Sequence, residues 1–237
     1  MNNNPIIRNE VDKGLAAFMT KTYAWMALAL IVTGLVSFVV VSSPQLIEAI
    51  IVNRFMFYAL LISEVALVWY LSSRLHTMTG AGATIMFLVY AALNGATLAV
   101  IFLVYTMSSI ASTFFITAGT FAVMSAYGYF TKKDLSSWGN LLFMGLIGII
   151  IASLANWFMQ SEMLYWIITY VGVFIFVGLI AYDTQKIKNM YAGIITTDED
   201  EVLEVQNKSA IMGALMLYLD FINLFLLLLR IFGGRRN

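Results

Sequence analysis

The stretch GALMLYLDFINLFLLLLRIF, from Gly213 to Phe232, decides the fold class. It is nearly all apolar, and Arg230 is its only cation. Because a helix rises about 1.5 Å per residue, this length crosses a hydrocarbon core of roughly 30 Å. Asp220 nevertheless lies inside the stretch, with Asn223 one turn later. A carboxyl group at this depth needs a protein or water environment, because a charge in lipid is costly.

The composition of the whole chain also indicates a membrane protein. Of its 237 residues, 61% are hydrophobic and only 11% are charged, whereas a soluble domain has about 25% charged residues. The net charge is zero, so no nucleic-acid partner is expected. The absence of cysteine excludes disulfides and thiolate metal sites. We therefore predict an all-α integral membrane protein whose main partner is the lipid bilayer.

Seven apolar runs of about twenty residues predict seven transmembrane helices. The runs lie at 22–43, 55–73, 83–105, 109–130, 138–159, 163–183 and 209–232. Because most connections are short, we expect one compact bundle.

The predicted boundaries divide the chain into a transmembrane domain and two tails. We expect an N-terminal cytoplasmic tail at 1–21, a seven-helix domain at 22–232 and a C-terminal tail at 233–237. The domain includes an acidic cytoplasmic loop at 184–208, where the run Asp198 to Glu201 reads as a solvated loop.

The distribution of Lys and Arg predicts the orientation. Nine of the thirteen cations fall on the side of the N-terminus, and the opposing loops hold only Arg54. The positive-inside rule therefore predicts a cytoplasmic N-terminus. Arg230, Arg235 and Arg236 conflict with this rule, because seven spans place the C-terminus outside. A re-entrant last segment is the alternative, but the length from Ala210 to Phe232 favours a full span.

Three acids lie within or at the edge of these apolar runs: Glu64, Asp183 and Asp220. Asp183 stands near the expected cytoplasmic end of its helix, where an ion pair with Lys186 would be ordinary. For Glu64, a structural hydrogen bond to a neighbouring helix and a transport role both remain open. Asp220 belongs to a stripe of small and polar residues that we expect to line a path through the protein. The stripe comprises Ser209, Gly213, Met216, Asp220, Asn223 and Leu227.

Small residues repeat every four positions on two predicted helices. One stripe contains Ala118, Ala122 and Ala126, and the other contains Gly148 and Ala152. Because small residues let membrane helices approach closely, these stripes predict packing faces.

No catalytic constellation is present in the sequence. There is no serine-histidine-acid set, no HExxH and no phosphate-binding glycine loop. An intramembrane aspartyl protease would also place two aspartates in helices, but its motifs match poorly. AYDTQ (181–185) shares two letters with the first motif, and LYLDFIN (217–223) lacks the glycines of the second. We therefore expect neither enzyme activity nor a tightly bound cofactor.

Three segments carry a resemblance to a known family. They are YGYFTKKDLSSWGNLLFMGLIGIIIASL (127–154), VGVFIFVGLIAYDTQKIKNMY (171–191) and ALMLYLDFINLFLLLLRIFG (214–233). Together they resemble the Bax inhibitor-1 family, also called the transmembrane Bax inhibitor motif proteins. The chain looks like a bacterial inner-membrane member. The resemblance implies a last helix surrounded by the other six, and a pH-sensitive calcium leak.

The resemblance also implies roles for individual residues. In that family, two aspartates on helices 6 and 7 form a hydrogen-bonded pair that senses pH, and they match Asp183 and Asp220. Arg74 matches a basic latch that ends helix 2, and Glu64 matches an acid within that helix. A pair with one shared proton holds its helices together. An ionised pair repels and attracts Ca²⁺ transiently, since this hard ion prefers oxygen ligands.

The depths of the two aspartates limit this arrangement. Counting along the helices places Asp183 about one turn from the interface and Asp220 about 18 Å along its helix. The carboxyls meet only if the last helix starts outside the bilayer, is tilted, or borders a cytoplasmic cavity.

Two functions of different classes follow. The first is a passive, pH-gated cation pathway that acts on calcium ions and protons. The second is a non-conducting regulatory protein that acts through membrane-protein partners. Ca²⁺ flux in proteoliposomes separates the two.

Overall fold

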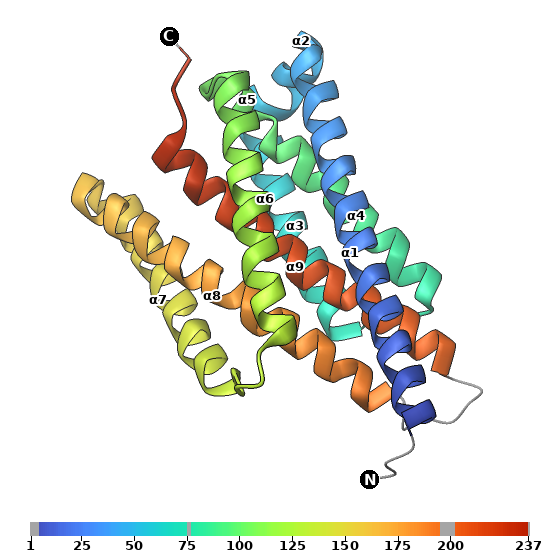
Figure 1. The fold of residues 1–237 in the computed structure, drawn as a ribbon. Helices are drawn as coiled ribbons and strands as arrows, with labels where there is room; N and C mark the ends of the chain where they lie inside the picture. Colours follow the sequence, from blue (N-terminus) through green and yellow to red (C-terminus); the bar gives the residue numbers. More distant parts are fainter. Residues whose placement is uncertain (1–4, 75–76, 195–201, 237) are drawn as a thin grey trace. The chain divides into compact units, whose positions relative to one another are not determined.

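The computed structural model describes residues 5–74, 77–194 and 202–236, which are almost entirely helical (Figure 1). Within these residues, seven helices are long and apolar enough to cross a membrane. They are Glu10–Ser42, Arg54–Arg74, Gly80–Val104, Met107–Phe130, Ser136–Met159, Glu162–Ile194 and Val202–Phe232. The predicted number of spans is confirmed, and the chain is an all-α membrane protein.

The helices are labelled in chain order. The long ones are α1 (Pro5–Ser42), α3 (Arg54–Arg74), α4 (Gly80–Leu98), α6 (Met107–Phe130), α7 (Ser136–Met159), α8 (Glu162–Ile194) and α9 (Val202–Phe232). The short ones are α2 (Pro44–Leu46), the π-helix η1 (Ile47–Val52) and α5 (Val100–Val104).

Three helices extend beyond the predicted spans. Helix α1 begins at Pro5, α8 continues to Ile194, and α9 begins at Val202. Phe18 and Ile187 lie in these extensions and are fully buried, so the apolar packing face continues past the length that a bilayer needs. Residues 1–4 of the predicted tail lie outside the described residues, as do residues 195–201, which include the acidic run.

The chain divides into two compact units, which are described one by one. Unit 1 comprises Met1–Ile101 and Ile187–Tyr218, and unit 2 comprises Phe102–Lys186 and Leu219–Asn237. Our expectation was a single bundle. Both units draw on α8 and α9, which explains why the loop lengths did not reveal the division.

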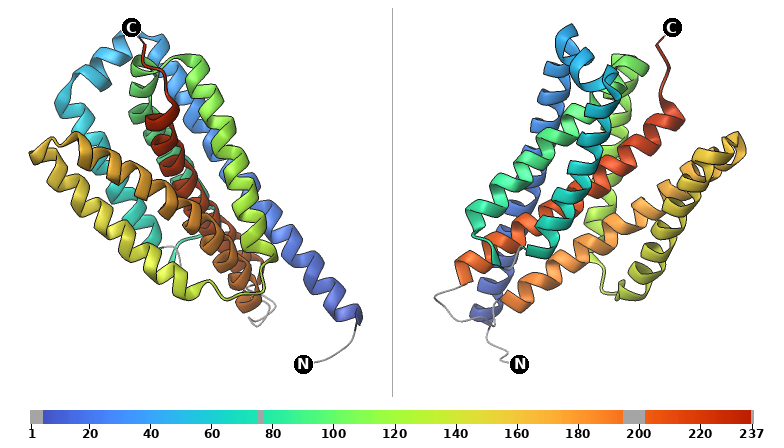
Figure 2. Two further views of the ribbon diagram at one scale, coloured as in Figure 1. Left: turned by 60° about the vertical axis from the view of Figure 1, so that its left-hand side comes forward. Right: turned by 180° about the vertical axis from the view of Figure 1, so that it is seen from behind.

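In unit 1, α4 lies alongside α1 and α3 (Figures 1 and 2). The Ser37 hydroxyl of α1 donates a hydrogen bond of 2.6 Å to the Gly95 carbonyl of α4. A Cβ atom at Gly95 would lie 2.6 Å from the Thr33 carbonyl oxygen. Only glycine therefore permits this approach of the two backbones.

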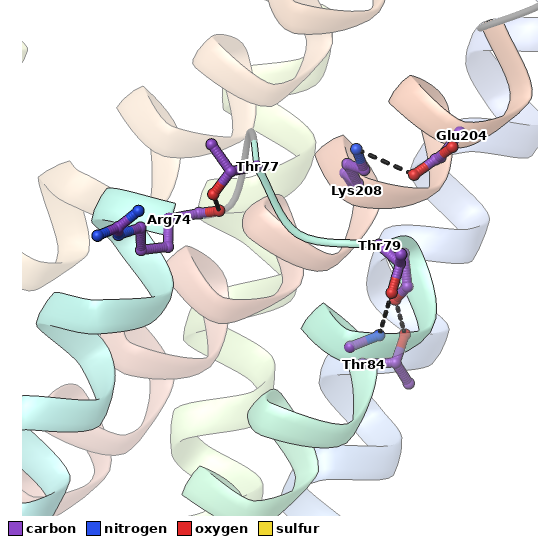
Figure 3. A network of polar contacts seen from close by, with 8 residues as sticks. Arg74, Thr77, Thr79, Thr84, Glu204 and Lys208 are labelled. Carbon is purple, nitrogen blue, oxygen red and sulfur yellow. Dashed lines mark hydrogen bonds and ion pairs between the residues drawn. The ribbon is translucent and has the colours of Figure 1, made fainter.

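The ends of α3 and α4 in unit 1 are closed by local hydrogen bonds (Figure 3). The Arg74 carbonyl accepts from the Thr77 hydroxyl at 2.9 Å. The Thr79 hydroxyl accepts from the Gly82 N–H at 3.2 Å, as expected of a residue that caps a helix N-terminus.

In unit 2, α7 and α8 run side by side (Figure 2). Gln160 joins them in the left-handed conformation, with φ of 52°. Gly145 lies against the Ile175 side chain, and Gly178 lies against Leu142. Four phenylalanine rings join α6 to α9: Phe114, Phe121, Phe221 and Phe225.

The packing face of α6 differs from the predicted alanine stripe. Ala122 and Ala126 are exposed, whereas Thr117, Phe121 and Ser125 are buried. The prediction is wrong because alanine is apolar enough to face lipid. The hydroxyl groups instead need hydrogen-bond partners within the protein. On α7, a Cβ atom at Gly148 would meet no atom within 4 Å, so that position does not pack closely either.

Helix α9 runs without a break over 31 residues. An unbroken helix of this length suits a full span rather than a re-entrant segment. Of its most apolar stretch, 72% is buried, against 44% or less in the other candidate spans of the described chain. This burial is what a central last helix requires, although its place among six others stays a prediction.

Protein contacts hold the cations near the C-terminus. The Arg230 guanidinium lies 5.3 Å from the centroid of the Tyr165 ring. The Arg236 N–H donates to the Val104 carbonyl at 2.9 Å, and Thr106 N–H donates to Gly234 at 3.1 Å. These contacts fix the end of α9 within unit 2.

The environment of Asp134, just before α7, predicts how the stability of the fold changes at low pH. Hydrogen bonds from the Ser136 side chain and N–H lower the pKa of the Asp134 carboxyl below its usual 3.8. A lowered folded-state pKa stabilises the fold above pH 3.8 and loses this effect as pH falls through the folded-state value. We expect Asp134→Ala to lower the melting temperature slightly at neutral pH and not in strong acid, measured by circular dichroism in detergent. A difference that persists in acid would contradict the charge-based account.

Candidate functional site

Two aspartates of unit 2 form a buried pair. Asp183 on α8 and Asp220 on α9 share a side-chain hydrogen bond. Asp220 is 5% exposed, and Asp183 is half-buried. Among the described residues, no group donates a hydrogen bond to Asp220 Oδ2. A buried carboxyl oxygen without a donor is costly, so this atom is a place where water or a cation would be favourable.

The motif AYDTQ (181–185) owes its position to close contacts at the two residues before Asp183. A Cβ atom at Gly128 of α6 would lie 2.2 Å from the Ala181 carbonyl oxygen. A Cβ atom at Gly139 of α7 would lie 2.3 Å from the Tyr182 ring. These two glycines therefore let α6 and α7 pack closely against α8 beside Asp183.

The two residues after Asp183 are held by hydrogen bonds. The Thr184 hydroxyl lies 2.8 Å from the Ser125 hydroxyl of α6. The Gln185 amide accepts from Leu135 N–H and donates to the Lys133 carbonyl, both at 2.8 Å. Asp183 is thus the member of the motif whose side chain meets Asp220 of α9.

The extensions of α8 and α9 explain how the carboxyl groups of Asp183 and Asp220 meet. Helix α8 continues from Asp183 to Ile194, about 16 Å at the rise of an α-helix. Helix α9 begins at Val202, about 27 Å before Asp220. Asp183 therefore does not end its helix, as the predicted span 163–183 implied, and both carboxyls lie well inside their helices.

Lys186 acts on the pair through its charge. Its positive charge interacts electrostatically with the carboxyl groups of both Asp183 and Asp220. Its ammonium group lies 5.9 Å from the centroid of the Tyr182 ring. Among the described residues, the ion pair found is Lys208–Glu204 at 3.0 Å, and Asp183 forms none with Lys186. The simple interfacial pair therefore does not describe Asp183, whose hydrogen bond goes to Asp220.

The site holds few ligands for a metal ion. Within the described part of the chain, no group of three or more His, Cys, Asp or Glu side chains could hold one. Two carboxyls can attract Ca²⁺ but fall short of its usual six to eight oxygen ligands.

The other residues singled out in the sequence lie elsewhere. Arg74 is exposed and belongs to unit 1, so its role as a latch stays a prediction. Glu64, also in unit 1, bonds to Asn94 and Thr97 of α4. Asn223 donates to the Leu219 carbonyl of its own helix at 2.8 Å.

The predicted polar stripe of α9 is partly a packing face. A Cβ atom at Gly213 would lie 3.0 Å from Thr22 and 3.1 Å from Ile187 in unit 1. Leu227 covers Gly172 in unit 2. At these two positions of the stripe, neighbouring side chains fill the space beside α9, so Gly213 and Leu227 do not line a path.

Sequence reasoning missed the partners of the acids. Asn94 and Thr97 bond to Glu64, and Tyr218 bonds to Asn94. Next to Asp183 along the chain, Thr184 bonds to Ser125, and Gln185 bonds to backbone groups before α7. One signal was available: Asn94 and Thr97 are three residues apart in an apolar run, so they share one face of α4. Their partner could not be identified without the fold.

Comparison with known proteins identifies the family of this chain. The family model described as inhibitor of apoptosis-promoting Bax1 matches residues 15–237. The chain belongs to the Bax inhibitor-1 family. Among relatives, it is 51% identical over 223 residues to the inner membrane protein YbhL of Escherichia coli, covering 94% of each chain.

Other Bax inhibitor-1 family relatives align over nearly the same length. The Rickettsia prowazekii protein RP147 is 45% identical over 231 residues, with 95% of this chain and 93% of that one covered. A Streptococcus pyogenes serotype M1 membrane protein is 37% identical over 233 residues, with 98% of each covered. The family assignment therefore extends over both units.

Proposed function

We propose that this Bax inhibitor-1 family protein is a passive, pH-sensitive pathway for cations, with Ca²⁺ as the permeant ion. The observation that carries the proposal is the hydrogen bond between the Asp183 and Asp220 carboxyls. Two carboxylates cannot hydrogen-bond to each other unless one of them holds a proton. In the proposed closed state, the pair therefore shares one proton.

The gate that we propose uses this shared proton. While the proton is bound, the pair joins α8 to α9 within unit 2. When the proton leaves, two like charges face each other in a poorly solvated site and repel. The separated carboxylates, with Asp220 Oδ2 already lacking a donor among the described residues, become oxygen ligands for an entering cation.

Arg74 is a secondary part of the proposal. It is exposed at the end of α3 (Figure 3) and carries a permanent charge. As a latch, it would exchange between partners when the pair ionises. The proposal includes no catalytic step and no bound cofactor.

The experiment that tests the function is Ca²⁺ flux into purified proteoliposomes at several pH values. We expect flux that rises as pH increases. The second function, a non-conducting regulator of membrane-protein partners, predicts no flux at any pH. Flux without pH dependence would keep the pathway but remove the gate.

We also propose that the protein lies in a bacterial inner membrane with its N-terminus in the cytoplasm. The Escherichia coli relative, named as an inner membrane protein, and the distribution of Lys and Arg support this. With seven spans, a reporter fused after Asn237 should be active outside the cytoplasm. Cytoplasmic activity there would overturn this topology.

A further inference from the structure

Unit 1 contains a buried chain of polar side chains that ends at Glu64. The Thr33 and Tyr218 hydroxyls lie 2.7 Å apart. Tyr218 donates to Asn94 Oδ1 at 3.1 Å, and Asn94 Nδ2 donates to Glu64 Oε2 at 3.1 Å. The Thr97 hydroxyl bonds to Glu64 Oε1. The chain joins α1, α9, α4 and α3, all through parts that belong to unit 1.

The hydrogen bonds between Tyr218 and Glu64 all run from donor to acceptor toward Glu64. A tyrosine hydroxyl has a single proton, and that of Tyr218 goes to Asn94. The Thr33 hydroxyl also has a single proton, for which the Tyr218 oxygen at 2.7 Å and the Ala29 and Ala91 carbonyls at 2.9 Å are all within reach. Asn94 Nδ2 and the Thr97 hydroxyl donate hydrogen bonds to Glu64. The donors of Tyr218, Asn94 and Thr97 are thus directed toward the Glu64 carboxylate.

No cation balances this carboxylate within the described residues. Glu64 is 8% exposed and forms no ion pair among them. The titratable groups that face it are Tyr90 from α4 and Tyr218 from α9. From the described part of α1, the Thr33 hydroxyl joins this hydrogen-bond network. A buried carboxylate without a counter-ion is costly, so the balancing charge has to come from solution.

Thr97 can rearrange to admit a proton at Glu64. Its oxygen also lies 3.3 Å from the Leu93 carbonyl. If Glu64 Oε1 takes a proton from water, that new O–H donates to Thr97. The Thr97 hydroxyl then turns to the Leu93 carbonyl. All heavy atoms stay in place, and each oxygen keeps a partner.

We propose that Glu64 is a second proton-binding site of this protein, distinct from the aspartate pair, and that Thr97 is its switching hydroxyl. The ligand is a proton taken from water. Proton binding removes the charge that strengthens the Asn94 and Thr97 hydrogen bonds, because charge-assisted bonds are roughly twice as strong as neutral ones. Occupancy of the site therefore changes how firmly α3 is tied to Tyr218 of α9.

Infrared difference spectroscopy of the full protein in liposomes tests this site as a function of pH. We expect a carboxylic-acid C=O band that appears on acidification and is lost in Glu64→Gln. Thr97→Val removes the hydroxyl and should shift the band to higher frequency, while Thr97→Ser restores it. The Asp183→Asn/Asp220→Asn double variant should keep the Glu64 band, which separates this site from the proposed gate.

Three outcomes would overturn the proposal. One is a pH difference spectrum unchanged by Glu64→Gln. Another is a Glu64 band present at every pH, which would make the group a permanently neutral structural acid. The third is a band whose frequency is the same in Thr97→Val as in the wild type. The Thr97 variants keep the test decisive if Glu64→Gln fails to fold.

Discussion

Replacing Asp220 by Asn is expected to flatten the pH dependence of Ca²⁺ flux and of conformation. The change removes the titrating group of the pair but keeps a side chain of similar shape that can donate a hydrogen bond to Asp183. Helices α8 and α9 should then stay joined from acidic to mildly alkaline pH. The measurement is proteoliposome flux at several pH values, with tryptophan fluorescence as the readout of conformation.

The partner residue and a matched control sharpen this test. Asp183→Asn should have the same effect, and the double variant should add little, because directly coupled residues are not additive. Glu204→Gln serves as the control, since Glu204 is an exposed acid on the same helix and pairs with Lys208. Independent, additive effects of the two aspartates would rule out a shared proton.

The second large effect is expected from Gly128→Ala on α6. The added Cβ would lie 2.2 Å from the Ala181 carbonyl oxygen. Because the nearest atom belongs to the backbone, no rotamer change relieves the contact, and α6 and α8 must move apart. Overpacking of this kind costs about 3 kcal/mol. Melting temperature in detergent should fall clearly.

A matched control is present on the same helix. A Cβ atom at Gly119 meets nothing within 4 Å, and alanine is the better helix former, so Gly119→Ala should not lower stability. Gly128→Ala should also alter the pH dependence of flux, because Ala181 lies two residues from Asp183. Equal stability of the two variants would show that α6 and α8 are not held in close contact at Gly128.

The apolar runs were sufficient to predict the membrane class and seven helices. Their length and composition alone indicate membrane helices, because every backbone polar group inside a bilayer must be hydrogen-bonded within a helix. The boundaries were less certain. Helix α8 continues past Lys186 and Lys188 to Ile194, because the buried face that includes Ile187 needs the helix beyond the membrane interface.

The packing faces could not be read from the sequence. The spacing of Ala122 and Ala126 predicted contact, yet both are exposed, while Gly128 and Gly139 seat the motif around Asp183. A small residue is equally compatible with lipid and with a close helix neighbour. Which of the two it meets depends on the rotation of its helix.

The sequence by itself determined that three acids lie in apolar helices, and the cost of a buried charge required each to have partners. The partners came from the tertiary structure. Asp183 meets Asp220 across α8 and α9, and Glu64 meets Asn94 and Thr97 across α3 and α4. The periodicity of one helix fixes which of its residues share a face, but only the packing of two helices brings a donor within about 3 Å of an acceptor.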